Sequence, residues 1–79
     1  MYYVYILKRP NDGPIYIGYT DDLKRRDKEH RGDKPGWKLI YYEAYFSKED
    51  ARAREEFLKH YGSSLGHLKN RIRNSLEAL

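Results

Sequence analysis

Residues 2–7 (YYVYIL) and 14–19 (PIYIGY) decide the fold, because both are rich in aromatic and β-branched residues, as strands are, and the first run is unbroken. Between them, residues 9–13 (RPNDG) are turn-forming: proline fixes φ, and Asn, Asp and Gly tolerate positive φ. Two strands joined by one tight loop predict an antiparallel hairpin. Gly18 weakens the second strand unless another part of the chain approaches its backbone closely.

A short helix and a third strand follow the hairpin. Residues 20–22 (TDD) supply an N-cap and acidic first-turn residues for a helix over residues 23–31. Residues 39–46 (LIYYEAYF) are again aromatic and β-branched, and they predict a third strand.

Two further helices complete the chain. Residues 47–50 (SKED) resemble a capping box that opens a helix of about four turns, ending at Gly62. A last helix is predicted over residues 65–76, where leucine and isoleucine recur at helical spacing. The order β-β-α-β-α-α favours an α+β fold, a small three-stranded antiparallel sheet flanked by helices. The predicted apolar stripe of the first of these helices consists of Ala51, Phe57, Leu58 and Tyr61.

Length and composition set limits on the function. Seventy-nine residues form one small domain, residues 1–79, too short for a double-wound dinucleotide-binding sheet. Charged residues make up 35%, but aromatics reach 15%, which indicates a chain that folds. The absence of cysteine excludes a disulfide, a Cys zinc site and a thiol nucleophile. With no apolar run of membrane-spanning length and no room for a signal peptide, we expect a cytoplasmic protein without a membrane partner.

The positive charge is clustered. Lys and Arg number 16 against 12 Asp and Glu, a net charge of +4, and the excess lies in residues 24–38 and near the C-terminus. Such clustering is typical of nucleic-acid-binding proteins, although it also occurs where charge only solubilises a helix. The candidate nucleic-acid contacts are Lys24, Arg25, Lys28, Arg31, Lys34 and Lys38.

The first helix has an unusual face. Leu23 is its only apolar side chain, and Arg26 and His30 share that face at positions i+3 and i+7. If Leu23 packs inward, Arg26 and His30 point inward or toward the rim of a cleft. The ordinary alternative is a histidine that interacts with the helix dipole.

Tyr5 and Tyr16 lie near the middle of the two hairpin strands. A register that pairs residue 5 with residue 16 puts both hydroxyls on one face, and a slip of one residue separates them. The sequence does not fix the register, and packing tyrosines are the ordinary alternative.

Glu55 borders the apolar stripe of the second helix, where a carboxylate is costly unless it is paired or metal-bound. The ordinary alternative is a salt bridge to a lysine or arginine of the sheet or of a neighbouring helix. Arginine, histidine, tyrosine and glutamate over one sheet face suit phosphodiester hydrolysis, because arginine binds phosphate and glutamate holds a hard cation. Tyrosine, with a free pKa near 10, acts as a base only beside a cation or a second base.

These residues are spaced in a recognisable pattern: residues 4–6 (VYI), residues 16–18 (YIG), Asp22-Leu23 with Arg26 and His30, and Arg54-Glu55 before Leu58-Lys59. The pattern resembles the GIY-YIG nuclease family. In the first motif, residues 3–5 (YVY) stand where the family name has Gly-Ile-Tyr. The chain looks like the small stand-alone bacterial members throughout its length.

The resemblance implies a metal-dependent endonuclease that hydrolyses DNA phosphodiester bonds with one divalent cation, Mg²⁺ or Mn²⁺. It implies that Tyr5 and Tyr16 place or deprotonate the attacking water, with the choice of base left open. Arg26 would stabilise the phosphorane, and His30 would support proton transfer or orient a tyrosine. Glu55 would bind the metal, and Gly18 would be needed for close packing beside the site.

The resemblance has two departures. The loop before the third strand, residues 31–38 (RGDKPGWK), is shorter than in relatives of this size. The family's late polar residue has no clear counterpart, with Asn70 and Asn74 as candidates.

The expected partner is DNA, single-stranded or structured, and these residues do not separate DNA from RNA. A partner protein or a weak homodimer is expected to add affinity. The alternative is a catalytically inactive nucleic-acid-binding or protein-interaction module on the same fold.

Overall fold

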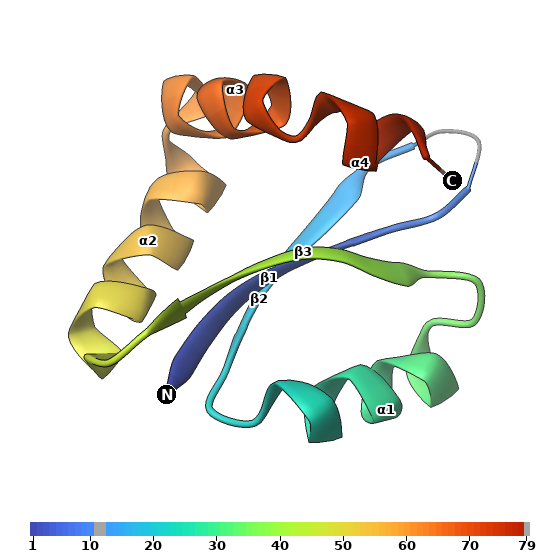
Figure 1. Ribbon diagram of the computed structural model, residues 1–79, viewed down its shortest axis with the longest axis horizontal. Helices are drawn as coiled ribbons and strands as arrows, with labels where there is room; N and C mark the ends of the chain where they lie inside the picture. Colours follow the sequence, from blue (N-terminus) through green and yellow to red (C-terminus); the bar gives the residue numbers. More distant parts are fainter. Residues whose placement is uncertain (11–12, 79) are drawn as a thin grey trace.

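A computed structural model describes residues 1–10 and 13–78 (Figure 1). Asn11 and Asp12 of the predicted turn lie outside the described residues, and Gly13 beside them has a φ of +91°, as the turn chemistry predicts. No helix among the described residues is long and apolar enough to span a membrane. The elements in chain order are β1 (Tyr2–Lys8), β2 (Ile15–Thr20), α1 (Leu23–Asp33), β3 (Lys38–Tyr45), α2 (Lys48–His60), α3 (Gly62–Arg71) and α4 (Arg73–Glu77).

The predicted α+β class and the three antiparallel strands are confirmed, and the last predicted helix is two helices. The break falls at Ile72, whose φ of −107° and ψ of 27° leave the helical region while its side chain stays buried. The boundary between α2 and α3 also differs from the prediction that the first of these helices ends at Gly62. α2 ends at His60, Tyr61 is extended, and Gly62 is the first residue of α3.

The strand order is β2-β1-β3, so β1 is central and its residues Val4–Leu7 are buried. Tyr5 pairs with Gly18 and Leu7 pairs with Tyr16. This register lies two residues away from a direct 5–16 pairing. Because side chains alternate with a period of two, Tyr5 and Tyr16 still share one face, as diagonal neighbours.

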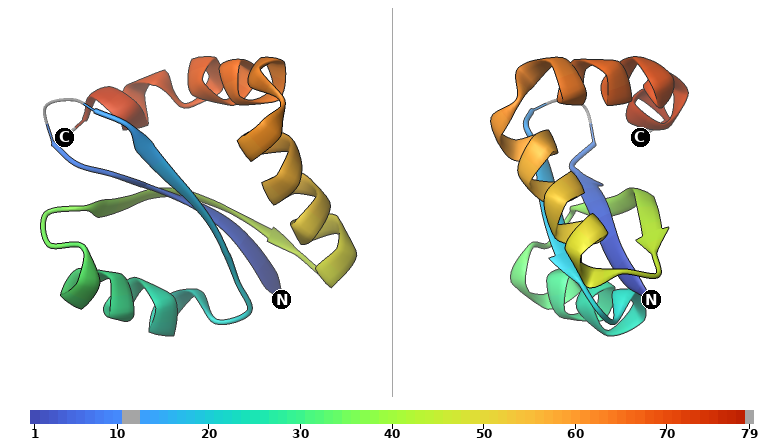
Figure 2. Two further views of the ribbon diagram at one scale, coloured as in Figure 1. Left: turned by 180° about the vertical axis from the view of Figure 1, so that it is seen from behind. Right: turned by 90° about the vertical axis from the view of Figure 1, so that its left-hand side faces the viewer.

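The two faces of the sheet carry different elements (Figures 1 and 2). On one face, Val4 and Ile6 pack in a core with side chains of α2, α3 and the break at Ile72. On the other face, α1 lies over the sheet and its only buried side chain is His30. The hydrophobic core and the Tyr5 side of the sheet are therefore separate layers.

The predicted apolar stripe of α2 is only half right. Ala51 and Leu58 are buried, but Phe57 is 48% exposed and Tyr61 is 54% exposed. The face of α2 that carries the buried Ala51 and Leu58 also carries positions 54 and 55, which are polar. This helix therefore packs with a face that is partly polar. Phe57 and Tyr61 instead contact each other, with ring centroids 5.2 Å apart.

Candidate active site

A buried hydrogen bond joins the central strand to α1. Tyr5 is 2% exposed and His30 is 4% exposed, and the Tyr5 hydroxyl lies 2.7 Å from His30 Nε2. The N-cap of α1 helps to fix this arrangement, since the carboxylate of Asp22 accepts a hydrogen bond from the Arg25 amide at 3.1 Å. The helix thus begins at a defined residue and delivers His30 to the face it shares with Leu23.

Tyr16 and Arg26 complete the cluster. The Tyr16 ring lies 6.2 Å from the Tyr5 ring and 5.3 Å from the His30 ring, so the three rings contact one another. Arg26 is one turn before His30, is half-buried, and pairs with Glu29 at 2.9 Å. The structure therefore brings together four of the five residues predicted to be catalytic, and these four are named the tyrosine cluster below.

Burial and nearby charges shift the pKa values of Tyr5 and His30 in opposite directions. Burial raises the pKa of Tyr5, and the Arg26 guanidinium opposes that rise. Burial lowers the pKa of His30, and the positive charges of Arg26 and Lys34 lower it further, against smaller contributions from Asp33 and Glu29. At neutral pH, Tyr5 is therefore a phenol beside a neutral imidazole.

The second ring nitrogen of His30, Nδ1, is buried and has no hydrogen-bond partner among the described residues. The neutral ring has one donor and one acceptor nitrogen, and its tautomer is set by the bond that the other nitrogen makes. Here only Tyr5 contributes such a bond, so the tyrosine is the partner that orients the ring.

Gly18 makes room for Tyr5. A Cβ atom at position 18 would lie 2.3 Å from both Cζ and the hydroxyl oxygen of Tyr5. Real Cβ atoms do not approach other atoms so closely, so the phenol occupies the space that any other residue would fill. This is the close approach that a glycine inside β2 requires.

Glu55 lies apart from the tyrosine cluster. Its side chain is 15% exposed and pairs with Lys59 Nζ at 3.0 Å and with Arg52 at 3.8 Å, both on its own helix. Among the described contacts, none joins Glu55 to Tyr5, Tyr16 or His30. Glu55 is thus paired, as in the ordinary alternative considered from the sequence, but its partners lie on α2 itself and not on the sheet or a neighbouring helix.

A groove between α1 and α2 connects the two regions. It is lined by Tyr19 and Thr20 of β2, by Asp21, Arg25, Arg26 and Glu29 at the start of and along α1, and by Lys48 and Arg52 of α2. The Arg52 guanidinium lies 4.3 Å from the Tyr19 ring centroid and also pairs with Glu55. Arg52 therefore links the Arg26 side of the groove to the predicted metal ligand.

Lys48 and Arg52 were missed by the sequence analysis. The signal was available, because Lys48, Arg52 and Glu55 follow one another at i, i+4 and i+7 and so share a face of α2. What the sequence could not supply was the packing that brings this face opposite Arg26.

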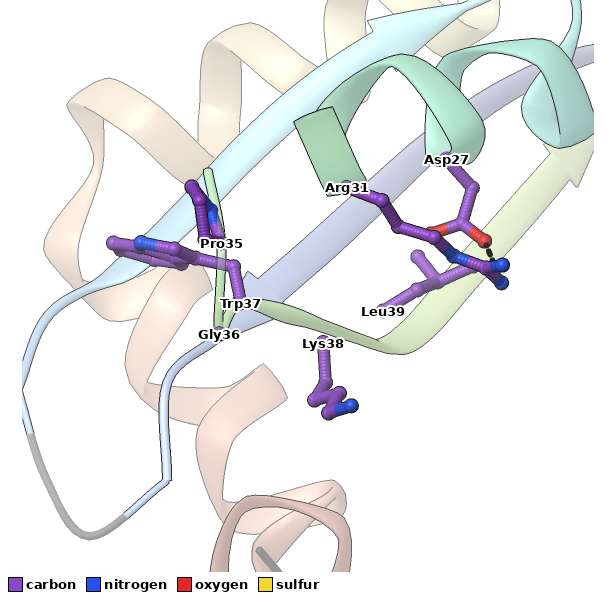
Figure 3. Close-up of a pocket in the computed structure, with 7 residues that line it drawn as sticks. All are labelled: Asp27, Arg31, Pro35, Gly36, Trp37, Lys38 and Leu39. Carbon is purple, nitrogen blue, oxygen red and sulfur yellow. Dashed lines mark hydrogen bonds and ion pairs between the residues drawn. The ribbon is translucent and has the colours of Figure 1, made fainter. Parts of the chain in front are cut away.

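The predicted nucleic-acid contacts divide between two sides of α1. Arg25 lines the groove beside Arg26, and Lys34 lies over the Tyr16 ring. Lys24, Lys28 and Arg31 line a pocket on the far side of the helix. Figure 3 shows a neighbouring pocket between α1 and β3, where Arg31 pairs with Asp27 at 2.9 Å and Lys38 points away from α1.

The donor set limits the kind of metal that the site suits. Among the described residues, no group of three or more His, Asp or Glu side chains gathers as a metal site. Glu55 is a single carboxylate, joined through Arg52 to a groove lined by several cations. This fits Mg²⁺, which keeps several waters and takes its other ligands from one or two carboxylates and substrate phosphates.

Comparison with known proteins identifies relatives. The GIY-YIG catalytic domain family matches residues 1–70. A UPF0213 protein of Clostridium perfringens is 40% identical over 75% of this chain and 71% of the relative. A UPF0213 protein of Streptococcus pneumoniae is 40% identical over 72% of this chain but only 65% of the relative, and one of Streptococcus agalactiae is 38% identical over 72% and 73%. No solved structure matches the chain significantly.

Proposed function

Because this chain belongs to the GIY-YIG catalytic domain family, we propose that it is an endonuclease that hydrolyses DNA phosphodiester bonds with one divalent cation. The observation that carries the proposal is the 2.7 Å hydrogen bond between the Tyr5 hydroxyl and His30 Nε2, with Tyr16 and Arg26 beside it. Family membership supports nuclease chemistry, and the cluster supplies groups that such chemistry needs.

Tyr5 is the better candidate for the general base, because it is the tyrosine bonded to a second base. In the tautomer with its proton on Nδ1, neutral His30 accepts the Tyr5 hydroxyl proton at Nε2. As that proton moves, the phenol oxygen takes one from the attacking water, whose oxygen bonds to phosphorus. The P–O bond to the leaving oxygen breaks, and solvent protonates that oxygen.

Arg26 and Tyr16 act on the phosphate and on the attacking water, beside the proton relay formed by Tyr5 and His30. The Arg26 guanidinium is charged at all relevant pH values and presents several donors to phosphate oxygens. It is therefore suited to the negative charge that builds up in the pentacoordinate transition state. Tyr16 contacts both rings of the relay, and we propose that its hydroxyl positions the attacking water.

Glu55 would hold the divalent cation, and Lys59 would release one carboxylate oxygen when it does so. When bound, such an ion neutralises charge on the scissile phosphate and its leaving oxygen. The cations of the groove, Arg25, Arg26, Lys48 and Arg52, would hold the strand by its phosphates.

The proposal is tested by cleavage of labelled single-stranded and duplex DNA, with Mg²⁺, with Mn²⁺ and with EDTA. We expect cutting that requires the metal and is lost in Glu55→Gln, which keeps the shape of the side chain. Glu56→Gln is the matched control, because Glu56 is exposed on the same helix and pairs with His60. DNA binding without cutting would instead support the inactive nucleic-acid-binding module.

A further inference from the structure

Lys34 is held between two aromatic rings beside the tyrosine cluster. Its Nζ lies 4.8 Å from the Tyr16 ring centroid and 5.8 Å from the Trp37 ring centroid. The residue is the C-cap of α1, and its backbone N–H donates to the His30 carbonyl at 2.7 Å. Both the backbone and the ammonium of Lys34 are therefore placed by neighbours in or near the cluster.

Trp37 also contacts a second cation. The Arg9 guanidinium, at the end of β1, lies 5.1 Å from the Trp37 ring centroid. A turn fixes the tryptophan: Gly36 has a φ of +88°, and the Trp37 amide donates to the Lys34 carbonyl at 3.1 Å. In Figure 3 Trp37 lines the pocket between α1 and β3 at the end away from Asp27 and Arg31.

Lys34 differs from the arginines of α1. Arg25, Arg26 and Arg31 all pair with carboxylates of α1, whereas Lys34 forms no ion pair with any described carboxylate. Its charge is offset only by ring faces, which attract a cation by about 0.5–1 kcal/mol at an exposed site. The ammonium is thus fixed in place and remains able to bind an anion.

Arg26, His30 and Lys34 follow one another at i, i+4 and i+8, and so form a row along α1. At 1.5 Å per residue, this row is about 12 Å long. Arg26 and Lys34 lie on either side of His30 in this row, and the charges of both lower the pKa of its ring. A phosphodiester at Arg26 would have its neighbouring phosphates within this row.

We propose that Lys34, Trp37 and Arg9 form a strand-binding subsite, in which the two cations bind phosphates beside the scissile bond and Trp37 holds both cations in position. The inference rests on the proposed nuclease function and adds to it the residues that hold the strand beside the scissile bond. DNA and RNA share the phosphate chemistry that the subsite binds.

Binding of a fluorescent 12-nucleotide single strand tests the subsite without turnover, in a Glu55→Gln background and over a range of salt. We expect Lys34→Met to weaken binding about fivefold at low salt and to reduce the salt slope by roughly 0.7, the value of one lost phosphate contact. Trp37→Ala should weaken binding similarly, whereas Trp37→Phe keeps a ring and should retain most of it. Lys69→Met, an exposed charge on α3, is the matched control.

Two further arms separate the inference from the function on which it rests. Equal losses on DNA and RNA strands identify the phosphates as the ligand, and a loss on one strand alone identifies that nucleic acid as the ligand. Lys34→Met should slow cleavage of the strand more than cleavage of bis(p-nitrophenyl) phosphate, because its effect on His30 acts on both substrates and its phosphate contact acts only on the strand. Lys69→Met should cleave both substrates like the wild type. If the wild type cleaves neither substrate, the nuclease proposal fails and the binding arm still decides the subsite. Binding by Lys34→Met and Trp37→Ala equal to that of Lys69→Met would overturn the inference.

Discussion

Tyr5 of β1 and His30 of α1 form a buried polar pair between the sheet and the helix. Burying polar atoms costs free energy unless they find partners, and the Tyr5 hydroxyl and His30 Nε2 supply one to each other. The same burial keeps the imidazole neutral, because a charged ring would be desolvated beside Arg26 and Lys34. Burial of the Tyr5–His30 pair therefore keeps His30 neutral, in the form that can accept a proton.

This pair should make stability depend on pH. Because the pKa of His30 is lower in the folded chain than its ordinary 6.5, the unfolded chain binds more protons just below pH 6.5. The free energy of unfolding should therefore fall as the pH falls from 7 toward 5. Urea unfolding at several pH values should show a smaller slope for His30→Gln. His67→Gln, at an exposed position, should retain the wild-type slope, and equal slopes in both variants would refute this account.

Gly18 should not tolerate alanine. The added methyl group would force the Tyr5 ring to move, and overpacking of this kind lowers the free energy of unfolding by about 1–3 kcal/mol. Gly66 on α3 has nothing within 4 Å of an added Cβ, so Gly66→Ala should raise stability by up to about 1 kcal/mol. Thermal or urea unfolding distinguishes the two. A Gly18→Ala variant as stable as the wild type would show that Tyr5 does not occupy this space.

At the scale of elements, a carboxylate connects β3 to α2. Glu43 accepts hydrogen bonds from Tyr41 and Tyr45 on its own strand and from Arg54, which binds both oxygens at 2.9 and 3.1 Å. Burial disfavours the charged carboxylate, but these bonds outweigh it and lower the pKa of Glu43. Since Arg54 precedes Glu55, this connection also fixes the orientation of the predicted metal ligand.

Loss of the connection should destabilise the fold. Arg54→Met leaves the half-buried Glu43 carboxylate without its main partner, and we expect the free energy of unfolding to fall by about 1–3 kcal/mol. Arg73→Met on α4, an exposed position, should change it little. The wild type should lose this contribution as the pH falls below 4.5, because the folded carboxylate resists protonation. Unfolding curves that are identical for both variants would contradict the assignment.

The three strands and the shared face of the first helix were predictable from the sequence, whereas the hairpin register that puts Tyr5 and Tyr16 on one face was left open and is given by the structure. Aromatic and β-branched runs predicted all three strands, and the shared face of Leu23, Arg26 and His30 placed the histidine correctly. Helical spacing continued through Ile72, where burial of the side chain in the core coincides with a break in the helix. Spacing also could not show that Lys48 and Arg52 would face Arg26, since that depends on packing across the sheet edge.

At the scale of the whole molecule, the hydrophobic core lies on one face of the sheet and the tyrosine cluster on the other. Most of the core lies between the sheet and helices α2 and α3, whereas α1 covers the other face with one buried side chain. Opening of α1 exposes the Tyr5 side of the sheet but leaves this core closed, so it should cost less free energy than opening of β1. Amide hydrogen exchange should be faster in Leu23–Asp33 than in Tyr2–Lys8. Equal protection of the two elements would show that they open only together.

The central claim is that the Tyr5–His30 pair removes the proton from the attacking water. The measurement that tests it most directly is the cleavage rate of a labelled single-stranded DNA by the wild type, Tyr5→Phe and Tyr42→Phe, with Mg²⁺ and with binding measured in parallel. Tyr42 pairs with Tyr5 in the sheet and is exposed, so it is the matched control. We predict that Tyr5→Phe loses about 10²- to 10⁴-fold in rate and keeps its affinity, while Tyr42→Phe cleaves like the wild type. A Tyr5→Phe protein that cleaves at the wild-type rate, or a wild type that binds the strand and never cuts it, would contradict the account.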